Sequence, residues 1–186
     1  MIQIETPEAR AAIAATEYWL KAAVIGLNLC PFAKAVQVKN QIRYVVSDAT
    51  NIDALADDLV AELELLAEAN AETIDTTLII CPNVLNDFLD FNDFLDVADG
   101  IVEELELDGI LQVAPFHPQF QFEGTEPDDI TNYTNRSPFP TLHLLREDSV
   151  TRAVEAFPDE LHIAENNIET MKKLGHAGWA ALFTVK

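Results

Sequence analysis

The densest group of residues that could do chemistry falls in one proline-rich segment, residues 115–147. The segment contains two of the four histidines, His117 and His143, and two arginines, Arg136 and Arg146. It also holds five prolines, and an irregular stretch of this length is uncommon in a compact domain unless it has a function. Because loops of this kind often carry the binding or catalytic groups of a rigid scaffold, we expect the functional site here.

Cys30 is the candidate nucleophile outside that segment. It lies in the stretch Asn28-Leu-Cys-Pro-Phe-Ala33, where Pro31 is favoured at the first position of a helix and Cys30 would be its cap. The helix dipole and Lys34, one turn away, would then stabilise a thiolate. The alternative is a small buried apolar residue, which unpaired cysteines often are. For Cys81, at the end of a strand-like apolar run, we predict an inert core thiol.

The two histidines of the proline-rich segment are candidate bases or metal ligands. His117 directly follows a predicted strand, so its ring could enter a loop-lined cleft. Its alternative role is an imidazole that pins the loop by bonding to a backbone carbonyl. His143 alternates with two leucines in a predicted strand, and it should face the opposite side of the sheet if those leucines enter the core. For His162 and His176 we predict surface positions.

A polar cluster precedes the last predicted strand. Asp129, Asn132, Asn135 and Arg136 supply a carboxylate, two amides and a guanidinium, which could bind an anionic or polar substrate. The same side chains could instead tie the loop together through hydrogen bonds to its own backbone. Arg146, at the end of the predicted strand, is a further candidate for substrate binding.

These candidates support two versions of an enzyme that acts on a small soluble substrate. In the thiol version, which a helix-start cysteine favours, Cys30 is the nucleophile or redox centre, His117 or His143 is its base, and Arg136 holds an anionic group. In the metal version, Cys30 and both histidines bind zinc or another transition metal. A non-catalytic module that binds a metabolite or a protein, and a loop with a purely structural role, are further alternatives. No Gly-rich phosphate loop, H-E-x-x-H or C-x-x-C motif is present.

Composition restricts the partners and the compartment. The 186 residues fit one domain with a substantial core. Since 32 acidic and 11 basic residues give a net charge of −21, we expect no nucleic acid and no membrane as a partner. A small-molecule ligand, including an anionic one, is compatible with this charge if a few cations gather locally. The two cysteines make no disulfide framework and no secretory pattern is present, so we predict a cytoplasmic protein.

Helices and strands alternate along the chain, which predicts an α/β sandwich with a mixed sheet of about four strands. The fourth strand follows the third without a helix, so it should run antiparallel to its neighbour. The expected helices begin at Thr6-Pro7-Glu8, at Thr50 or Asn51, near Val84, at Asp148 or Ser149, and at Pro158. The first should end near Gly26 and the last at Gly175. The expected strands are residues 43–47, 76–81, 110–116 and 141–145.

Four stretches carry a resemblance to a known family. They are Cys30-Pro-Phe-Ala33, Phe116-His-Pro-Gln-Phe-Gln-Phe122, the run of residues 132–140 that ends in Asn135-Arg-Ser-Pro-Phe-Pro140, and His143-Leu-Leu-Arg-Glu147. In order and spacing they resemble the DUF1415 family of bacterial single-domain proteins, whose function is unassigned. The resemblance covers nearly the whole chain and implies a shared polar site. That implied site comprises Cys30, His117, Asn135, Arg136, His143 and Arg146. Cys81 lies outside the family pattern.

Overall fold

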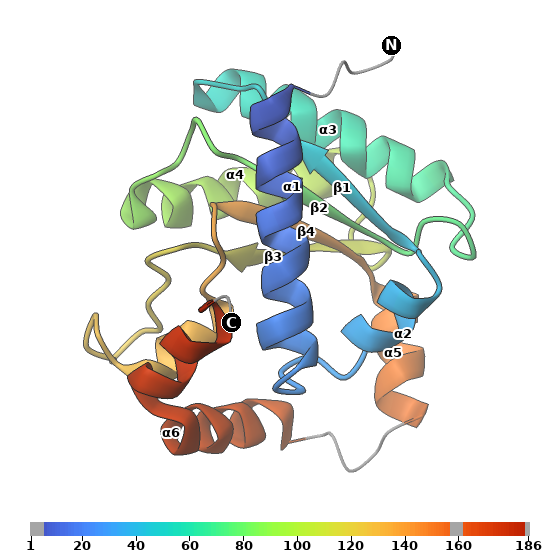
Figure 1. Cartoon of the computed structure of the whole chain (residues 1–186). Coiled ribbons are helices and arrows are strands. Elements are labelled where there is room, and N and C mark those ends of the chain that lie inside the picture. Colours follow the sequence, from blue (N-terminus) through green and yellow to red (C-terminus); the bar gives the residue numbers. More distant parts are fainter. Residues whose placement is uncertain (1–5, 157–161, 185–186) are drawn as a thin grey trace.

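A four-stranded mixed sheet forms the middle layer of the molecule, and helices cover both of its faces (Figure 1). The computed structural model describes residues 6–156 and 162–184. The strands are β1 (Ile42–Val46), β2 (Thr76–Ile80), β3 (Leu111–Phe116) and β4 (Thr141–Arg146). Their order is β1-β2-β4-β3, with β1 parallel to β2 and β4 antiparallel to both of its neighbours. The predicted α/β class, with one domain and a mixed sheet, is confirmed.

One face of the sheet carries the larger core, beneath α3 (Ile52–Glu68) and α4 (Phe88–Glu104). The apolar stripe of α3 is fully buried at four positions: Leu55, Leu59, Leu63 and Leu66. Ile52 continues the stripe to the first residue of the helix, where it is 48% exposed. α4 begins at Phe88 rather than near Val84, since the Asp87 carboxylate accepts hydrogen bonds from the first free N–H groups. It continues through Asn92 without interruption to Glu104.

The opposite face is covered by α1 and by shorter helices (Figure 1). α1 (Pro7–Trp19) begins as predicted, because the Thr6 hydroxyl accepts a hydrogen bond from the N–H of Ala9 at 3.1 Å. It continues into a π-helix, η1 (Leu20–Ile25), whose wider turn is of a kind often found at functional sites. α2 (Ala33–Val38) and α5 (Glu147–Ala156) complete this layer.

The last helix, α6 (Ile163–Leu182), is kinked. Gly175 has φ +65° and ψ 173°, which interrupts the helix at the residue where the sequence predicted its end. The chain then resumes helical geometry to Leu182, so that prediction located a kink rather than a terminus. The predicted helix start at Pro158 lies outside the described residues. Among the described residues, no helix is both long and apolar enough to span a bilayer.

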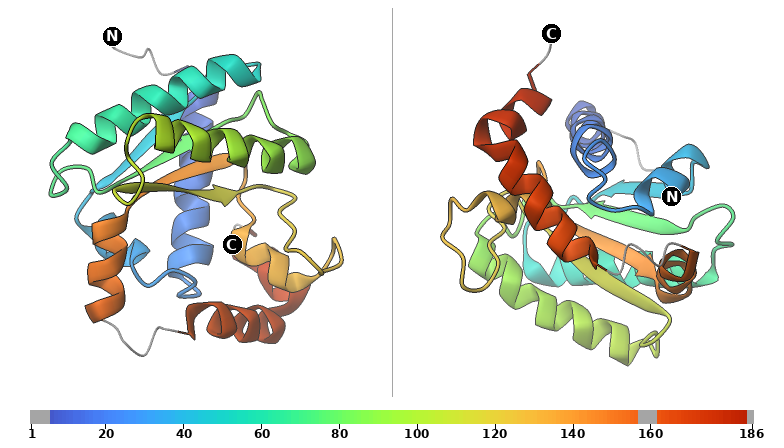
Figure 2. Two further views of the ribbon diagram at one scale, coloured as in Figure 1. Left: turned by 180° about the vertical axis from the view of Figure 1, so that it is seen from behind. Right: turned by 90° about the horizontal axis from the view of Figure 1, so that it is seen from below.

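α6 lies against the long loop between β3 and β4, which contains the 3-10 helix η2 (Ile130–Asn135) (Figure 2). The ring of Tyr133 meets that of Trp179 edge-on, with centroids 5.4 Å apart. The Nε2 atom of His176 lies 2.7 Å from the carbonyl oxygen of Asp128. His162 and His176 are both exposed, as predicted. The C-terminal helix therefore supports the proline-rich loop from outside.

Candidate functional site

His117 is buried on the α3–α4 side of the sheet. Its Nδ1 accepts a hydrogen bond from the N–H of Gln119 at 3.0 Å, so the proton must sit on Nε2, which donates to the carbonyl of Leu85 at 3.1 Å. The ring packs between Phe88 and Phe91, with centroids 5.4 and 5.0 Å away. Burial lowers the pKa of His117, which keeps the ring neutral. Both ring nitrogens are thus engaged, and the geometry fits the loop-pinning role rather than a base in a cleft.

Asn132 and Asp129 hold the loop together from within. The Asn132 side chain is fully buried, and its Oδ1 accepts hydrogen bonds from the N–H of Phe122 at 2.9 Å and the hydroxyl of Thr125 at 2.8 Å. Its Nδ2 donates to the carbonyl of Glu126 at 2.8 Å. Asp129 caps η2 by accepting from the N–H and hydroxyl two residues later, and these bonds lower the pKa of its carboxyl group. Both expected substrate-binding residues therefore contact their own loop.

Arg136 and Asn135 have the same kind of environment. The Arg136 Nε donates to the carbonyl of Phe120 at 3.2 Å, and its Nη2 donates to that of Pro127 at 2.5 Å. The guanidinium lies over the ring of Tyr133, 4.1 Å from its centroid. Asn135 donates to a backbone carbonyl of β3 at 3.2 Å. The structure therefore supports the alternative in which the polar cluster orders the loop.

The other face of the sheet is hollowed by a cavity of about 860 Å³. It lies over the sheet between η1, α2 and α5, and most of its lining is apolar, including Trp19, Val24 and Phe116. Cys30 and His143 both line it, whereas His117 does not. The structure therefore brings two of the three expected catalytic residues to one cavity and separates the third.

His143 lines the cavity from the sheet, in β4. In the sheet it is directly opposite Leu78 of β2 and Ala114 of β3, and all three side chains line the cavity. The flanking leucines of β4 enter the opposite core, as the alternation predicted. His143 Nε2 lies 2.7 Å from the Thr76 hydroxyl, which itself donates to the Leu144 carbonyl at 2.6 Å. Since the hydroxyl proton is used there, Nε2 carries the ring proton and Nδ1 is an acceptor.

Burial lowers the pKa of His143 to about 4. At neutral pH the ring is therefore uncharged, and it offers the cavity an aromatic edge and a lone pair rather than a cation. Phe116 packs beside it, with ring centroids 5.8 Å apart. The inner part of the cavity is consequently apolar and electrically neutral at this point.

Cys30 lines the cavity but is not a helix cap, and that expectation was wrong. α2 has six residues, begins at Ala33 and has Phe32 at its N-cap without a side-chain hydrogen bond. The Cys30 carbonyl accepts from the N–H of Ala33 at 3.2 Å, so Pro31 and Phe32 form a turn before the helix. Cys81 is fully buried in the core, and this burial raises the pKa of its thiol to about 12, in agreement with an inert role.

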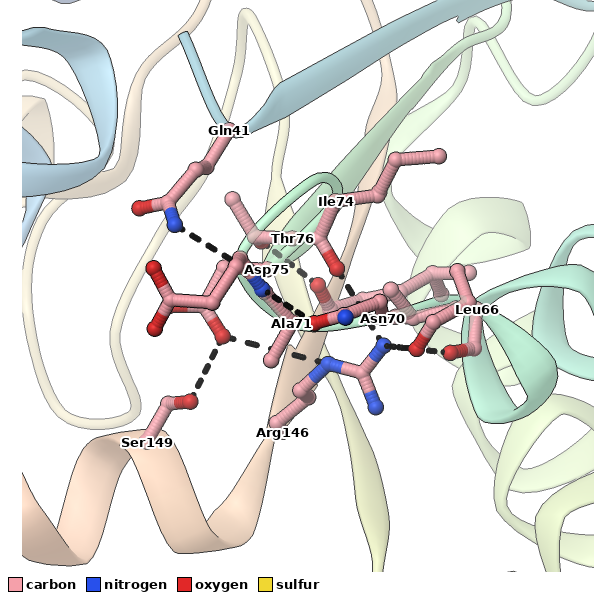
Figure 3. A network of polar contacts seen from close by, with 12 residues as sticks. Gln41, Leu66, Asn70, Ala71, Ile74, Asp75, Thr76, Arg146 and Ser149 are labelled. Atoms are coloured by element: carbon pink, nitrogen blue, oxygen red, sulfur yellow. Dashed lines mark hydrogen bonds and ion pairs between the residues drawn. The ribbon is translucent and has the colours of Figure 1, made fainter. Parts of the chain in front are cut away.

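The guanidinium of Arg146 binds the turn between α3 and β2 (Figure 3). Its Nη2 atom donates to three backbone carbonyls, those of Leu66, Ala69 and Ile74, at 2.6, 2.7 and 3.2 Å. Its Nε lies 3.8 Å from the Asp75 carboxylate, which accepts a hydrogen bond from the hydroxyl of Ser149 at 2.6 Å. Leu66 lies in the last turn of α3 and Ala69 directly follows the helix. Carbonyls at this end of a helix lack partners within the helix. Arg146 thus fastens α3 to the sheet.

The predicted metal site is not assembled. Cys30 and His143 line the cavity, but His117 lies on the other side of the sheet with both nitrogens bonded. Within residues 6–156 and 162–184, no group of three or more His, Cys, Asp or Glu side chains is arranged to hold a metal ion.

Several cavity residues were not identified from the sequence, and they share a pattern. Gln112 and Ala114 alternate along β3, while Thr76 and Leu78 alternate along β2, so each pair faces the same side as His143. The period of two was visible in the sequence. The pairing of β4 with both strands, which puts these rows side by side, was not.

The chain belongs to the DUF1415 family, described as proteins of unknown function, because the family model matches residues 11–181. No curated protein and no solved structure matches the chain.

Proposed function

We propose that this member of the DUF1415 family binds a small molecule whose apolar body fills the cavity between the sheet, η1, α2 and α5. The cavity itself carries the proposal: its volume of about 860 Å³ lies within the roughly 300–1,000 Å³ of typical small-molecule sites. An apolar lining with a few inward polar groups is also typical of such sites. The polar groups here include Gln41, Gln112 and His143.

The shape of the cavity follows from small side chains at positions that larger ones could fill. Alanines line it from the sheet and from both flanking helices: Ala33, Ala35, Ala114 and Ala153. Folded interiors are normally close-packed, and an apolar void forfeits dispersion contacts. Space of this size above a sheet is therefore better explained by a ligand than by packing alone.

The proposal is tested with a neutral fluorescent probe, N-phenyl-1-naphthylamine, whose emission rises in an apolar site. We expect saturable binding to the intact protein. Ala114→Phe should raise the Kd at least about tenfold, because the added ring projects from the cavity's floor. Ala11→Phe is the matched control, since Ala11 is exposed on α1 and lies outside the cavity. Equal binding by both variants, with intact thermal unfolding, would contradict the proposal.

A second candidate, an enzyme that uses a cysteine thiol, is supported by one observation: Cys30 and His143 line the same cavity. Because Nε2–H of His143 is used by Thr76, Nδ1 is the nitrogen that could take a proton from a thiol or a substrate. Iodoacetamide labelling across pH tests this role, and Cys81 does not interfere because it is fully buried.

Because His143 with a pKa of about 4 is a weak base toward a thiol, this candidate requires the Cys30 thiolate to stabilise an imidazolium beside it. We then expect alkylation of Cys30 with a midpoint below the ordinary thiol pKa of about 8.5. His143→Gln should move the midpoint toward that ordinary value, and the bound naphthylamine probe should slow the labelling. A midpoint near 8.5 in both proteins would remove this candidate and leave the binding proposal intact.

A further inference from the structure

The rim of the cavity has a charge opposite to that of the protein as a whole. Four of the 11 Lys and Arg residues line the cavity, but only two of the 32 acidic residues do. The four cations are Lys34, Lys39, Arg146 and Arg152, and the two acids are Glu72 and Asp75. In a chain of net charge −21, this is a local reversal of sign.

Two of these charges compensate each other. The Arg146 Nε atom and the Asp75 carboxylate face each other at 3.8 Å, and the Nη2 atom of Arg146 donates to backbone carbonyls. Without that pair, the charged residues of the lining are three cations, Lys34, Lys39 and Arg152, and one acid, Glu72. All three cations are exposed, so they stand at the mouth of the cavity rather than on its floor.

The lysines of α2 are available to a ligand. Within the described residues, neither Lys34 nor Lys39 forms an ion pair with a carboxylate. The Arg152 Nη2 atom donates a hydrogen bond to the Ser149 hydroxyl at 2.9 Å, which holds it beside the mouth. A cleft with low-dielectric walls and cations of one sign attracts anions to that point.

The floor has the opposite character. Leu78 of β2 is buried there, Trp19 and Leu20 of the covering helices are also buried against the cavity, and the His143 ring is neutral at physiological pH. A charged group would lose its hydration on this floor without an opposite charge to compensate it. A ligand that satisfies both ends must therefore carry its charge at one end only.

From this geometry we infer that the ligand is a small amphipathic anion. Its apolar chain or ring system lies over β2, β4 and β3, and its carboxylate, phosphate or sulfonate lies at the rim between α2 and α5. The inference rests on the proposed function, because it names the class of molecule that the same cavity binds.

The test compares two probes that share one ring system. 1-Anilinonaphthalene-8-sulfonate is N-phenyl-1-naphthylamine with an added sulfonate, and titration of the intact protein gives a Kd for each. Lys34→Glu/Lys39→Glu reverses the two rim charges on α2 and at its C-cap. We expect it to raise the sulfonate's Kd by about tenfold, or about 1.4 kcal/mol. The Kd of the neutral probe should change less than about twofold, since it has no group at the rim.

The matched control is Lys172→Glu/Lys173→Glu, which makes the same change in net charge on α6, away from the cavity. It should leave the sulfonate's Kd within about twofold at physiological salt, where the Debye length is about 8 Å. Equal weakening by both double variants would trace the effect to the overall field and overturn the inference. Thermal unfolding of each variant checks that the fold is intact.

Competition against the neutral probe identifies the head group. Decanoate and decyl phosphate should displace it, and decyltrimethylammonium, a cation with the same chain, should not. Displacement by all three alike would overturn the inference but leave the proposed function standing. Failure of the neutral probe itself to bind would remove both.

Discussion

Replacing Arg146 with methionine should be among the most destabilising single changes in this protein. Methionine has a similar length and keeps the apolar contacts of the arginine stem, so the substitution isolates the guanidinium. The carbonyls of Leu66, Ala69 and Ile74 would lose their shared donor, and Asp75 would lose the cation that lies 3.8 Å away. The arginine side chain is 13% exposed and the Asp75 side chain 16%, so water can replace the lost donors only in part.

The magnitude follows from these contacts. One Nη2 atom has two hydrogens, so it fully serves two carbonyls, and the bonds of 2.6 and 2.7 Å are the strong ones. Each charge-assisted hydrogen bond contributes about 1.5–3 kcal/mol. Removing one partner of a buried ion pair costs about 3–5 kcal/mol. Because these terms overlap, we expect a loss of about 3–5 kcal/mol, which for a chain of this length lowers Tm by roughly 6–20 °C.

Urea unfolding followed by tryptophan fluorescence measures this loss. Arg152→Met is the control, since Arg152 is exposed on α5 and its removal should stay within about 0.5 kcal/mol. The double variant Arg146→Met/Asp75→Asn separates the ion pair from the carbonyl bonds. It should recover only the ion-pair part of the loss. A loss below about 1 kcal/mol in Arg146→Met would refute the structural role that we assign to this arginine.

Three further predictions follow from single residues. His143 has a pKa of about 4 in the folded chain against about 6.5 unfolded, so its contribution to stability is complete above pH 6.5 and declines as pH falls toward 4. The free energy of unfolding, measured with urea, should fall between pH 7 and pH 4.5 by about 2–3 kcal/mol less in His143→Gln than in the unchanged protein. Gly26→Ala should lower the free energy of unfolding by about 1–3 kcal/mol, because a Cβ there would overlap the Ala22 carbonyl oxygen. Gly100→Ala should raise it by about 0.5–1 kcal/mol, because this helix position has open space around it. Asn132→Leu should cost about 1–3 kcal/mol, since it removes three part-buried hydrogen bonds that hold the loop, and amide exchange in residues 117–135 should accelerate.

The features that could be predicted from sequence were set by local chemistry. The Thr6-Pro7 start of α1, the Asn51 cap of α3 and the leucine stripe of α3 each depend on residues within a few positions of one another. The same holds for the alternation around His143, which correctly placed its two leucine neighbours in the core. Local rules failed at Cys30, where a proline that suits a helix start instead forms a turn and the helix begins at Ala33.

The relative position of the two histidines depended on register, which is not local. In the antiparallel pair of β3 and β4, Ala114 lies opposite His143, so even-numbered positions of β3 share its face. His117, an odd-numbered position just beyond the strand, turns to the other side. A shift of one residue in the pairing of β3 with β4 would have put the odd-numbered positions of β3 on the same face as His143. No property of either segment taken alone specifies that shift.

The order of the strands also constrains how the chain can be synthesised and folded. In the described part of the chain, β4 separates β2 from β3 and pairs with both, yet it is the last of the four strands to leave the ribosome. A nascent chain that ends before Thr141 has an open slot in its sheet and two unsatisfied strand edges. Translation beyond Arg146 is thus required before the sheet can close, and until then those edges are available for pairing with other chains.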